Sequence, residues 1–323
     1  MEFHTLANSK IKISKTSLGT WSLGGEMGSE TQYRKISKKN SIKIISSAYE
    51  MGINFFDTSP TYGDSHKILG ECFSKNRKHI VISTKIGINS YIEEKKFNKK
   101  FISKQIFNFL KDIKTDYIDI IYFYCPNPKK DSINEAYQYL NKLKENGIIR
   151  SIGVSVANPC DLNKFNKNIK FEIAQCNFNI LDNRIIQKEN LNYIQKNQIS
   201  IVARTIFCFG IFTEKFLNNG KKIFNNDHRN RWSSKQLQRW KEGIIKIKEI
   251  NNNQSIEQIA LRFVNSFKFI SSSLIGIQNI SELKSNLREI NLKKLKKNIL
   301  KKIIEINNNN TFFLKDDSPN KKI

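Results

Sequence analysis

The chain has 323 residues, 39% of them hydrophobic, and carries 55 Lys and Arg against 29 Asp and Glu, a formal charge of +26. This length is ordinary for one (β/α)8 barrel, and the apolar fraction suffices for a large core, so we expect a single domain. The lysines are spread from end to end in short pairs among Ile and Asn residues. Because no basic stripe gathers them, the composition argues against a specific nucleic-acid site.

The cysteines and the apolar segments narrow the class further. The five cysteines lie far apart and form no C-x-x-C pair, so we predict no metal site and a reduced, cytoplasmic setting. Residues 1–14 alternate polar and apolar side chains and lack the apolar core of a signal peptide, and no apolar run reaches 18 residues. The sequence therefore predicts neither a secretion signal nor a membrane span.

Short β-rich runs alternate with helix-period stretches along the chain, which is typical of consecutive βα units. The predicted strands are residues 17–20, 53–57, 80–85, 118–124, 151–156, 171–176, 199–204 and 271–276. The predicted helices are residues 41–51, 65–73, 99–113, 133–146, 161–165 and 187–197, with further helices after 234. Gly52 and Gly147 stand where C-terminal helix caps belong.

Eight such units favour a closed barrel, because a doubly wound open sheet usually stops at five to seven strands. We therefore predict a single (β/α)8 TIM barrel over residues 1–310. The long interval between residues 204 and 276 is expected to hold a loop insert and an extra helix after the seventh strand. Residues 291–309 are expected to form a terminal helix, and 311–323 a polar tail.

The candidate catalytic residues lie where predicted strands end. Asp57 ends one strand, Tyr62 follows in a Pro/Gly loop, and Lys85 ends the next strand. Barrel enzymes keep their chemistry at this edge, and a lysine closing a buried run needs a partner such as Asp57. Taken singly, each residue also has a structural interpretation: Asp57 as a cap, Tyr62 as a loop aromatic and Lys85 as a snorkelling lysine.

The stretch G-I-N-F-F-D-T-S-P-T-Y-G, followed by S-T-K, resembles the aldo-keto reductase family. The resemblance covers residues 10 to about 290 and implies an NAD(P)H-dependent oxidoreductase that reduces an aldehyde, ketone or sugar-type carbonyl, or oxidises the alcohol. It implies that Asp57, Tyr62 and Lys85 are catalytic, with Tyr62 as the general acid. A free phenol has a pKa of about 10, so a nearby cation that favours the phenolate is required. Lys85 would be that cation, oriented by Asp57.

One member of the family's catalytic set is replaced. The family's histidine at the end of the fourth strand is matched by Tyr124. A tyrosine hydroxyl can still donate a hydrogen bond to a carbonyl, but it is longer than imidazole and changes the space above the nicotinamide. An alternative is therefore a nicotinamide-binding regulatory or weakly active barrel protein.

The glycines at 24, 25 and 28 do not follow the G-x-G-x-x-G spacing, so a dinucleotide must be held another way. The resemblance implies that Ser155 and Gln175 hold the nicotinamide carboxamide, although Val156 replaces the family's Asn. Arg204 stands where many relatives carry a stacking tyrosine, with a salt bridge to a loop carboxylate as the alternative. The full predicted cofactor set is Thr20, Trp21, Ser155, Gln175, Arg204, Lys215, Gly276, Gln278, Glu282 and Asn286.

The choice of cofactor is predicted from residues 276–288. Gly276 ends the last strand, and the helix that follows offers N-terminal amides to an anion. The position that commonly carries a base for the 2′-phosphate holds Gln278, whereas Lys284 and Arg288 lie further along the helix. We expect NADP, with NAD as the alternative, because basic side chains such as those of Lys284 and Arg288 can bind the 2′-phosphate of NADP.

Overall fold

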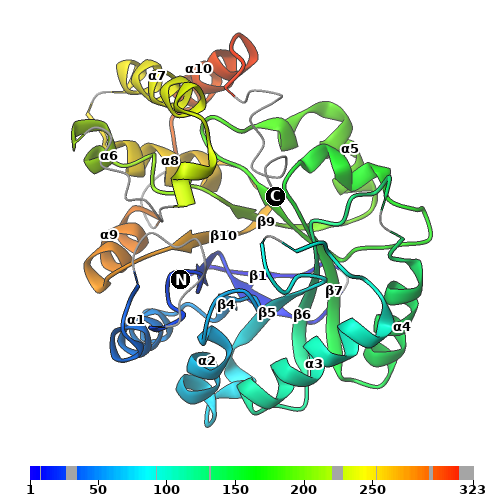
Figure 1. The fold of residues 1–323 in the computed structure, drawn as a ribbon. Coiled ribbons are helices and arrows are strands. Elements are labelled where there is room, and N and C mark those ends of the chain that lie inside the picture. Colours follow the sequence, from blue (N-terminus) through cyan, green and yellow to red (C-terminus); the bar gives the residue numbers. More distant parts are fainter. Residues whose placement is uncertain are drawn as a thin grey trace.

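The computed structural model describes residues 1–7, 9–26, 35–91, 93–130, 132–219, 228–251, 253–290 and 294–312. Eight parallel strands close into a barrel in the order β10-β3-β4-β5-β6-β7-β8-β9, with helices around it (Figure 1). They are β3 (Thr16–Gly19), β4 (Phe55–Asp57), β5 (Val81–Ile86), β6 (Ile118–Tyr124), β7 (Ile149–Val156), β8 (Ile173–Asn177), β9 (Ser200–Arg204) and β10 (Ile270–Gly276). The predicted (β/α)8 barrel and all eight predicted strands are confirmed.

The helices follow the predicted pattern closely. They are α1 (Lys38–Glu50), α2 (Ser65–Phe73), α3 (Lys99–Ile113), α4 (Asn134–Glu145), α5 (Lys188–Lys196), α6 (Glu214–Asn219), α7 (Ser234–Ile250), α8 (Ile256–Asn265), α9 (Ile280–Ile290) and α10 (Lys297–Asn308). Short 3₁₀ turns form η1 (Arg77–His79), η2 (Pro159–Lys164), η3 (Arg184–Ile186) and η4 (His228–Arg231). The predicted helix at 161–165 is thus a 3₁₀ turn, because the segment is too short to offset the cost of an α-helical nucleus.

The two glycines predicted as helix caps have the expected backbone. Gly52 has a φ of +91° after α1, and Gly147 has a φ of +76° after α4. These left-handed values suit glycine because it carries no Cβ. Each cap turns the chain directly into the next barrel strand, so the predicted helix ends are confirmed.

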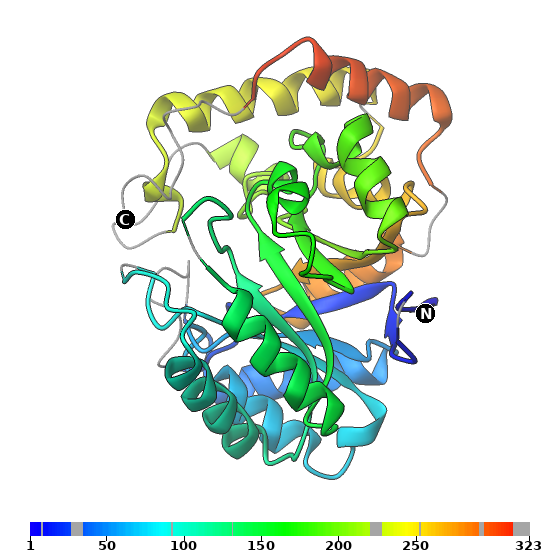
Figure 2. The same cartoon turned by 90° about the vertical axis from the view of Figure 1, so that its right-hand side faces the viewer.

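The N-terminus forms a hairpin that was not predicted from the sequence. Strands β1 (Phe3–Thr5) and β2 (Lys12–Ser14) pair antiparallel at one end of the barrel (Figure 2, dark blue). The side chains of Leu6, Ile11 and Ile13 join those of the barrel interior in one buried cluster. The hairpin therefore closes the N-terminal end of the barrel, which we call the floor.

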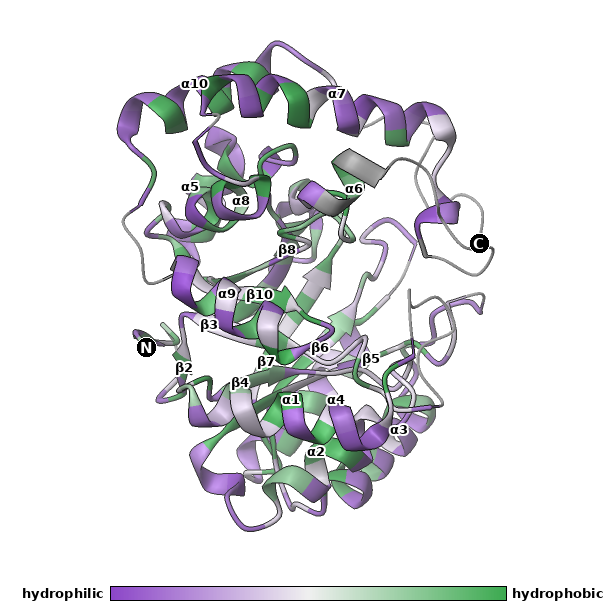
Figure 3. Cartoon of the chain, turned by 90° about the vertical axis from the view of Figure 1, so that its left-hand side faces the viewer, coloured by the Kyte–Doolittle hydropathy of each residue, from purple (hydrophilic) through white to green (hydrophobic). Residues whose placement is uncertain are grey.

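The insert after β9 contains α6, η4 and α7, so the predicted loop and extra helix are confirmed. Helix α7 lies beside α10 (Figure 2), and Figure 3 shows both with hydrophilic and hydrophobic residues alternating along them. Phe312 packs on α7 at Gly243, where a Cβ would lie 2.6 Å from its ring. Gln236 Nε2 also donates to the Phe312 carbonyl at 2.6 Å. The start of the predicted polar tail thus packs on α7, and residues 313–323 lie outside the described part.

Among the described helices, none combines the length and the apolar composition that crossing a membrane requires.

Candidate active site

Asp57 and Lys85 form a buried ion pair at the C-terminal ends of two neighbouring strands. Lys85 Nζ lies 2.6 Å from Asp57 Oδ2 and donates a second hydrogen bond to the Thr58 carbonyl at 2.9 Å. Both charged residues are only 1% exposed. Burial lowers the pKa of Lys85, and the adjacent Asp57 carboxylate opposes this shift. Asp57 and Lys85 therefore form a desolvated ion pair rather than a solvent-exposed surface salt bridge.

Tyr62 lies directly against this pair. Lys85 Nζ is 4.9 Å from the centroid of the Tyr62 ring. Burial raises the pKa of Tyr62 well above its ordinary value, with nearby Tyr91 and Asp57 adding to the shift and Arg204 opposing it. From the sequence we expected the cation to favour the phenolate, but burial outweighs that effect here. Tyr62 thus stays protonated at neutral pH and can act as a proton donor.

The loop that carries Tyr62 is braced by the segment after β3. A Cβ at Gly24 would lie 2.1 Å from the Tyr62 carbonyl oxygen, so only glycine fits there. The Asp64 amide donates to the Gly24 carbonyl at 3.0 Å, and the Tyr62 amide donates to the Ser59 carbonyl at 3.1 Å. Two segments far apart in the sequence therefore hold the phenol in place.

A chain of hydrogen bonds extends from Asp57 across the barrel. The second carboxylate oxygen, Oδ1, accepts from Ser83 Oγ at 2.7 Å and from Gln175 Nε2 at 2.8 Å. The Gln175 oxygen in turn accepts from Ser155 Oγ at 3.1 Å. None of these residues is more than 1% exposed. The two residues predicted to hold the carboxamide are therefore joined to the predicted catalytic carboxylate.

Tyr124 ends β6 and faces the same site. Burial raises its pKa above the ordinary value, so the hydroxyl stays protonated through the physiological range. It also interacts electrostatically with Tyr62, Tyr91 and Arg204. Directly after it, Cys125 has a φ of +44°, a left-handed conformation that is uncommon for a residue other than glycine. The strand therefore stops abruptly and leaves Tyr124 at the barrel edge.

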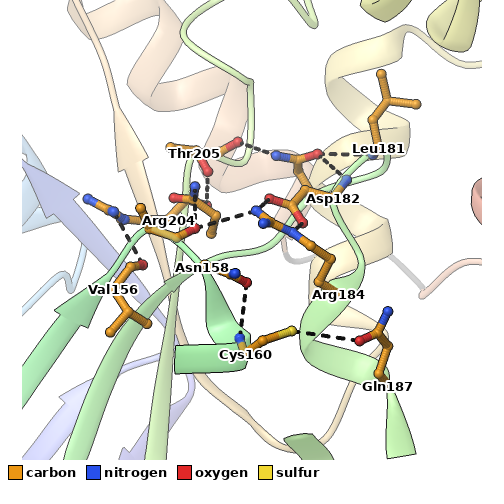
Figure 4. Close-up of polar contacts among 12 residues, drawn as sticks. Val156, Asn158, Cys160, Leu181, Asp182, Arg184, Gln187, Arg204 and Thr205 are labelled. Atoms are coloured by element: carbon orange, nitrogen blue, oxygen red, sulfur yellow. Dashed lines mark hydrogen bonds and ion pairs between the residues drawn. The ribbon is translucent and has the colours of Figure 1, made fainter. Parts of the chain in front are cut away.

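Arg204 ends β9 without forming a salt bridge to any described carboxylate. One guanidinium nitrogen donates to the Val156 carbonyl at 3.3 Å (Figure 4) and lies 3.9 Å from Cys125 Sγ. The buried Nε has no hydrogen-bond partner among the described residues. The nearby Asp182 instead pairs with Arg184 at 2.7 Å, also drawn in Figure 4. The alternative interpretation of Arg204 as a partner of a loop carboxylate finds no support in the described part of the chain.

The start of α9 is occupied by the chain's own carboxylate. The Gln278 amide donates to Glu282 Oε2 at 2.8 Å, and Asn279 Nδ2 donates to Glu282 Oε1 at 2.8 Å. The Glu282 amide donates back to Asn279 Oδ1 at 2.8 Å. These reciprocal contacts resemble a capping box. The amide expected to bind a phosphate is therefore already hydrogen-bonded, and it lies beside a negative charge.

The remaining predicted cofactor residues lie in three places: directly after β3, at the end of β10 with the following helix α9, and in the insert after β9. Thr20 follows β3, and its buried hydroxyl donates to the Asp57 carbonyl at 3.0 Å. Trp21, next in the chain, is partly buried, whereas Gly276 is exposed at the end of β10. Asn286 lies one helical turn beyond Glu282. The Lys215 side chain lies outside the described part of the structure.

Two site residues were not predicted. Ser83 lies two residues before Lys85 in β5, so the period of two along a strand indicates that both side chains point to the same side. Tyr91 comes from the loop after β5, and its hydroxyl accepts from Thr61 Oγ1 at 3.1 Å. Strand periodicity could have found Ser83, whereas no pattern in the loop indicates Tyr91.

Metal ligands do not cluster in the described part of the chain. No group of three or more His, Cys, Asp or Glu side chains there could hold a metal ion.

Comparisons with known proteins point to one family. The model of the Aldo/keto reductase family matches residues 15–308. The uncharacterized oxidoreductase YqkF of Bacillus subtilis (strain 168) is 26% identical, covering 91% of this chain and 93% of that protein. The NADH-specific methylglyoxal reductase of Escherichia coli (strain K12) is 29% identical, covering 64% and 68%. The holo form of an aldo-keto reductase from Bacillus halodurans superposes with a TM-score of 0.77 at 21% identity, covering 95% and 96%.

The family match spans nearly the whole barrel, and the solved structure shares its fold. The chain therefore belongs to the aldo/keto reductase family and is an oxidoreductase.

Proposed function

We propose that the protein is a nicotinamide-dependent reductase of an aldehyde, ketone or sugar-type carbonyl, or catalyses the reverse oxidation of the alcohol. The observation that carries this proposal is the buried Asp57–Lys85 pair against the ring of Tyr62. A buried ion pair costs free energy, and packing alone does not require one at the end of a barrel. Beside a protonated phenol, the pair suits proton transfer to a carbonyl oxygen.

In the proposed mechanism, Tyr62 donates its proton to the carbonyl oxygen and becomes a phenolate. The Lys85 ammonium lies close enough to stabilise that phenolate, and Asp57 holds the ammonium in place. The carbonyl carbon would accept a hydride, which a reduced nicotinamide would supply when bound. Because burial keeps Tyr62 protonated at neutral pH, the phenol carries the proton that the carbonyl oxygen would accept.

Tyr124 is proposed as the second hydrogen-bond donor to the carbonyl oxygen. Its hydroxyl stays protonated because burial raises its pKa, so it can donate across the physiological pH range. A histidine has an ordinary pKa of about 6.5, and in the same place it would change charge near or below that pH. The substitution therefore exchanges a titrating donor for one that does not titrate.

The residues present fit a dinucleotide at several points. The unpartnered Nε of Arg204 and its lack of a described carboxylate partner leave the guanidinium plane available for stacking. A Cβ at Gly276 would meet no non-neighbouring atom within 4 Å, so the backbone there is open to a ligand. We propose Ser155 and Gln175 for the carboxamide. For the rest of the cofactor we propose the remaining predicted residues, namely Thr20, Trp21, Arg204, Lys215, Gly276, Gln278, Glu282 and Asn286.

The sequence favours NADP, but the contacts at α9 favour the alternative, NAD. Glu282 holds the Gln278 amide and brings a carboxylate to the place where a 2′-phosphate would need positive charge. Lys284 and Arg288 lie two and six positions after Glu282 in α9. Side chains at these spacings point to different faces of a helix, so neither shares the face of Glu282. The name of the NADH-specific relative from Escherichia coli supports the same choice. We therefore take NAD as the working cofactor.

The setting proposed for the protein follows from its cysteines, all five of which are free thiols. Free thiols favour the reducing cytoplasm, which is where we place the protein. Its partners are then a nicotinamide cofactor and a small carbonyl or alcohol, without a specific nucleic-acid or membrane partner.

The direct test is turnover by the purified protein. NADH oxidation should be measured with a broad panel of aldehydes, ketones and sugars, and Tyr62→Phe should abolish it. Tyr139→Phe is the matched control, because the Tyr139 hydroxyl accepts from Ser103 in the helix layer, away from the site. Equal rates for wild type and Tyr62→Phe would remove Tyr62 from the mechanism.

A second candidate is a nicotinamide-binding barrel with little turnover. The replacements at Tyr124 and Val156 favour it, because both alter contacts around the nicotinamide. Cofactor binding measured by fluorescence, without turnover across the panel, would support this candidate over the first.

A further inference from the structure

Gln175 contacts two parts of the proposed site at once. Its amide nitrogen lies 2.8 Å from Asp57 Oδ1, and its oxygen accepts from Ser155 Oγ at 3.1 Å. Strand pairing places Ser155 opposite Gln175, whereas the contact with Asp57 spans the barrel from β8 to β4. Gln175 is 1% exposed, so these contacts do not exchange freely with water. One side chain therefore touches both the catalytic carboxylate and a predicted cofactor contact.

We propose that Gln175 is a positioning residue that couples cofactor binding to the acid, by holding Asp57 and through it Lys85. This inference rests on the proposed function, because that function assigns the roles of Lys85 and Tyr62. The hydrogen bonds of Gln175 run to Asp57 and Ser155 rather than to Lys85 or Tyr62. It acts through the Asp57 carboxylate.

The hydrogen-bond inventory of Asp57 explains why Gln175 matters. Oδ2 receives Lys85, whereas Oδ1 receives Ser83 and Gln175. A carboxylate buried to this degree depends on its donors, because a lost hydrogen bond to a charged group costs more than one between neutral groups. Loss of the Gln175 donor would leave Oδ1 with Ser83 alone and loosen the orientation of the carboxylate that holds the Lys85 ammonium. The cation would then be less precisely placed beside the Tyr62 ring.

The same amide has hydrogen-bonding capacity left over. A glutamine amide has two N–H donors and two acceptor sites, of which Asp57 and Ser155 use one each. The remaining donor and acceptor suit a carboxamide, which offers the complementary pair. A cofactor contact at Gln175 would thus be transmitted to Asp57 without any larger movement.

Several titratable and charged groups surround the Asp57–Lys85 pair. Their pKa values would respond to a charge introduced at residue 175. They come from the catalytic loop, from α2, from β6, β8 and β9 and from the loop after β6, and are Tyr62, His66, Tyr122, Tyr124, Cys125, Cys176 and Arg204. Because these groups are also present in a control variant elsewhere in the chain, a pH dependence found only in the Gln175 variant arises from the introduced carboxyl or from its effect on these groups.

Gln175→Glu tests the coupling. A carboxyl at this place lies against Asp57, so burial and the like charge raise its pKa above the usual value of about 4.3. When protonated it still donates to Asp57, and when ionised it repels Asp57. We expect kcat within about threefold of wild type at pH ~5.5 and about tenfold to a hundredfold below it at pH ~8. The Kd for NADH, followed by its own fluorescence, should weaken over the same interval.

Gln236→Glu is the matched control. Gln236 is also 1% exposed, but it lies in α7 and donates to the backbone carbonyl of Phe312 rather than to a carboxylate. Burial raises the pKa of the introduced carboxyl in Gln175→Glu and in Gln236→Glu. Both variants should therefore lose stability relative to wild type as pH rises above about 4, the pKa of the unfolded carboxyl. Only Gln175→Glu should also change kcat and the NADH Kd with pH. Identical pH profiles of kcat and Kd in the two variants would overturn the inference and leave the proposed function intact.

A milder pair of variants guards against misfolding. Ser155→Ala removes the anchor of the Gln175 amide, whereas Ser151→Ala, in the same strand, removes a buried hydroxyl without a hydrogen-bond partner among the described residues. We expect Ser155→Ala to lower kcat several-fold and shift its pH profile, and Ser151→Ala to do neither. If Ser155→Ala matches Ser151→Ala, Gln175 does not position the acid. A wild-type protein that neither binds NADH nor turns over would instead sink the proposed function itself.

Discussion

The barrel interior has two ends with opposite chemistry. At the floor, Phe55 and Val81 pack with Leu6 and Ile13 of the N-terminal hairpin in an apolar cluster. At the C-terminal end, which we call the mouth, Asp57 and its partners form a network of charged and polar side chains. Phe55 and Asp57 are only two residues apart in β4, a rise of about 7 Å. The same strand therefore supplies a core residue and then a proposed catalytic one, since both point inward.

The apolar floor lets the barrel tolerate the charged mouth. Two charges buried in the barrel cost free energy even when paired, and the burial of apolar side chains at the floor offsets that cost. Variants at the mouth should therefore change chemistry, with a loss of stability where they leave a buried charge unpaired. Variants at the floor should lower stability and leave the chemistry of the folded protein intact.

The largest effect is expected at the mouth, for Lys85→Met. Loss of the ammonium leaves the Asp57 carboxylate buried without its partner and Tyr62 without a cation. We expect kcat/KM to fall by about 10³-fold, within the range that positioned acid–base groups contribute. Steady-state kinetics at constant folded fraction measures it. A variant that keeps full activity would contradict the division between mouth and floor.

The complementary change is Phe55→Ala at the floor. Removal of a fully buried ring from the apolar cluster should lower the free energy of unfolding by about 3–5 kcal/mol. The kcat of the remaining folded protein should stay near wild type. Chemical denaturation followed by circular dichroism checks the first part. Phe107→Ala is the control, because Phe107 is 64% exposed and its loss should be nearly neutral.

A smaller effect is expected for Tyr124→His, which restores the family's residue. Burial keeps the Tyr124 hydroxyl protonated, so wild-type kcat/KM should not vary through titration of this donor between pH ~5.5 and ~8. A histidine introduces a group with an ordinary pKa of about 6.5, and the profile should gain a limb near or below that pH. We expect a change of about tenfold across the limb. Identical profiles would show that residue 124 does not contact the substrate.

The smallest effect is expected outside the barrel interior, at Glu282→Gln. The Glu282 side chain is exposed, so solvent screens its charge and limits the repulsion of a 2′-phosphate. Wild type should bind NADH more tightly than NADPH, and Glu282→Gln should narrow that difference about fivefold. Fluorescence titration with both cofactors measures it. Tighter binding of NADPH by wild type would restore the original prediction of NADP.

The barrel was predictable from the sequence because its strands are short, buried and separated by regular helices. Gly52 and Gly147 cap helices as predicted, since a left-handed cap has few alternatives to glycine. The hairpin was missed because each of its strands has three residues, too few for a periodic signal. The alternation over residues 1–14 argues against a signal peptide, but it does not locate a turn between two strands.

The site was predictable only in part. Strand ends and family wording indicated Asp57, Tyr62 and Lys85, which the structure brings together. The contact between Gln175 and Asp57 depends on which strands face each other across the barrel. No local sequence pattern indicates which strands these are. The occupied amide of Gln278 likewise depends on the rotamer of Glu282 rather than on residue types alone.

Closure of the barrel by β10 against β3 has a consequence for how the chain folds. Lys15 Nζ donates to the Ile270 carbonyl at 2.8 Å, and Ser273 pairs with Thr16, so the first and last barrel strands meet only after most of the chain exists. Contacts of such sequence separation form slowly. During synthesis, β3 and β9 keep open edges until residue 276 is available, and open edges pair readily with other chains. The open edges of β3 and β9 are thus sites where the incomplete chain can aggregate during translation.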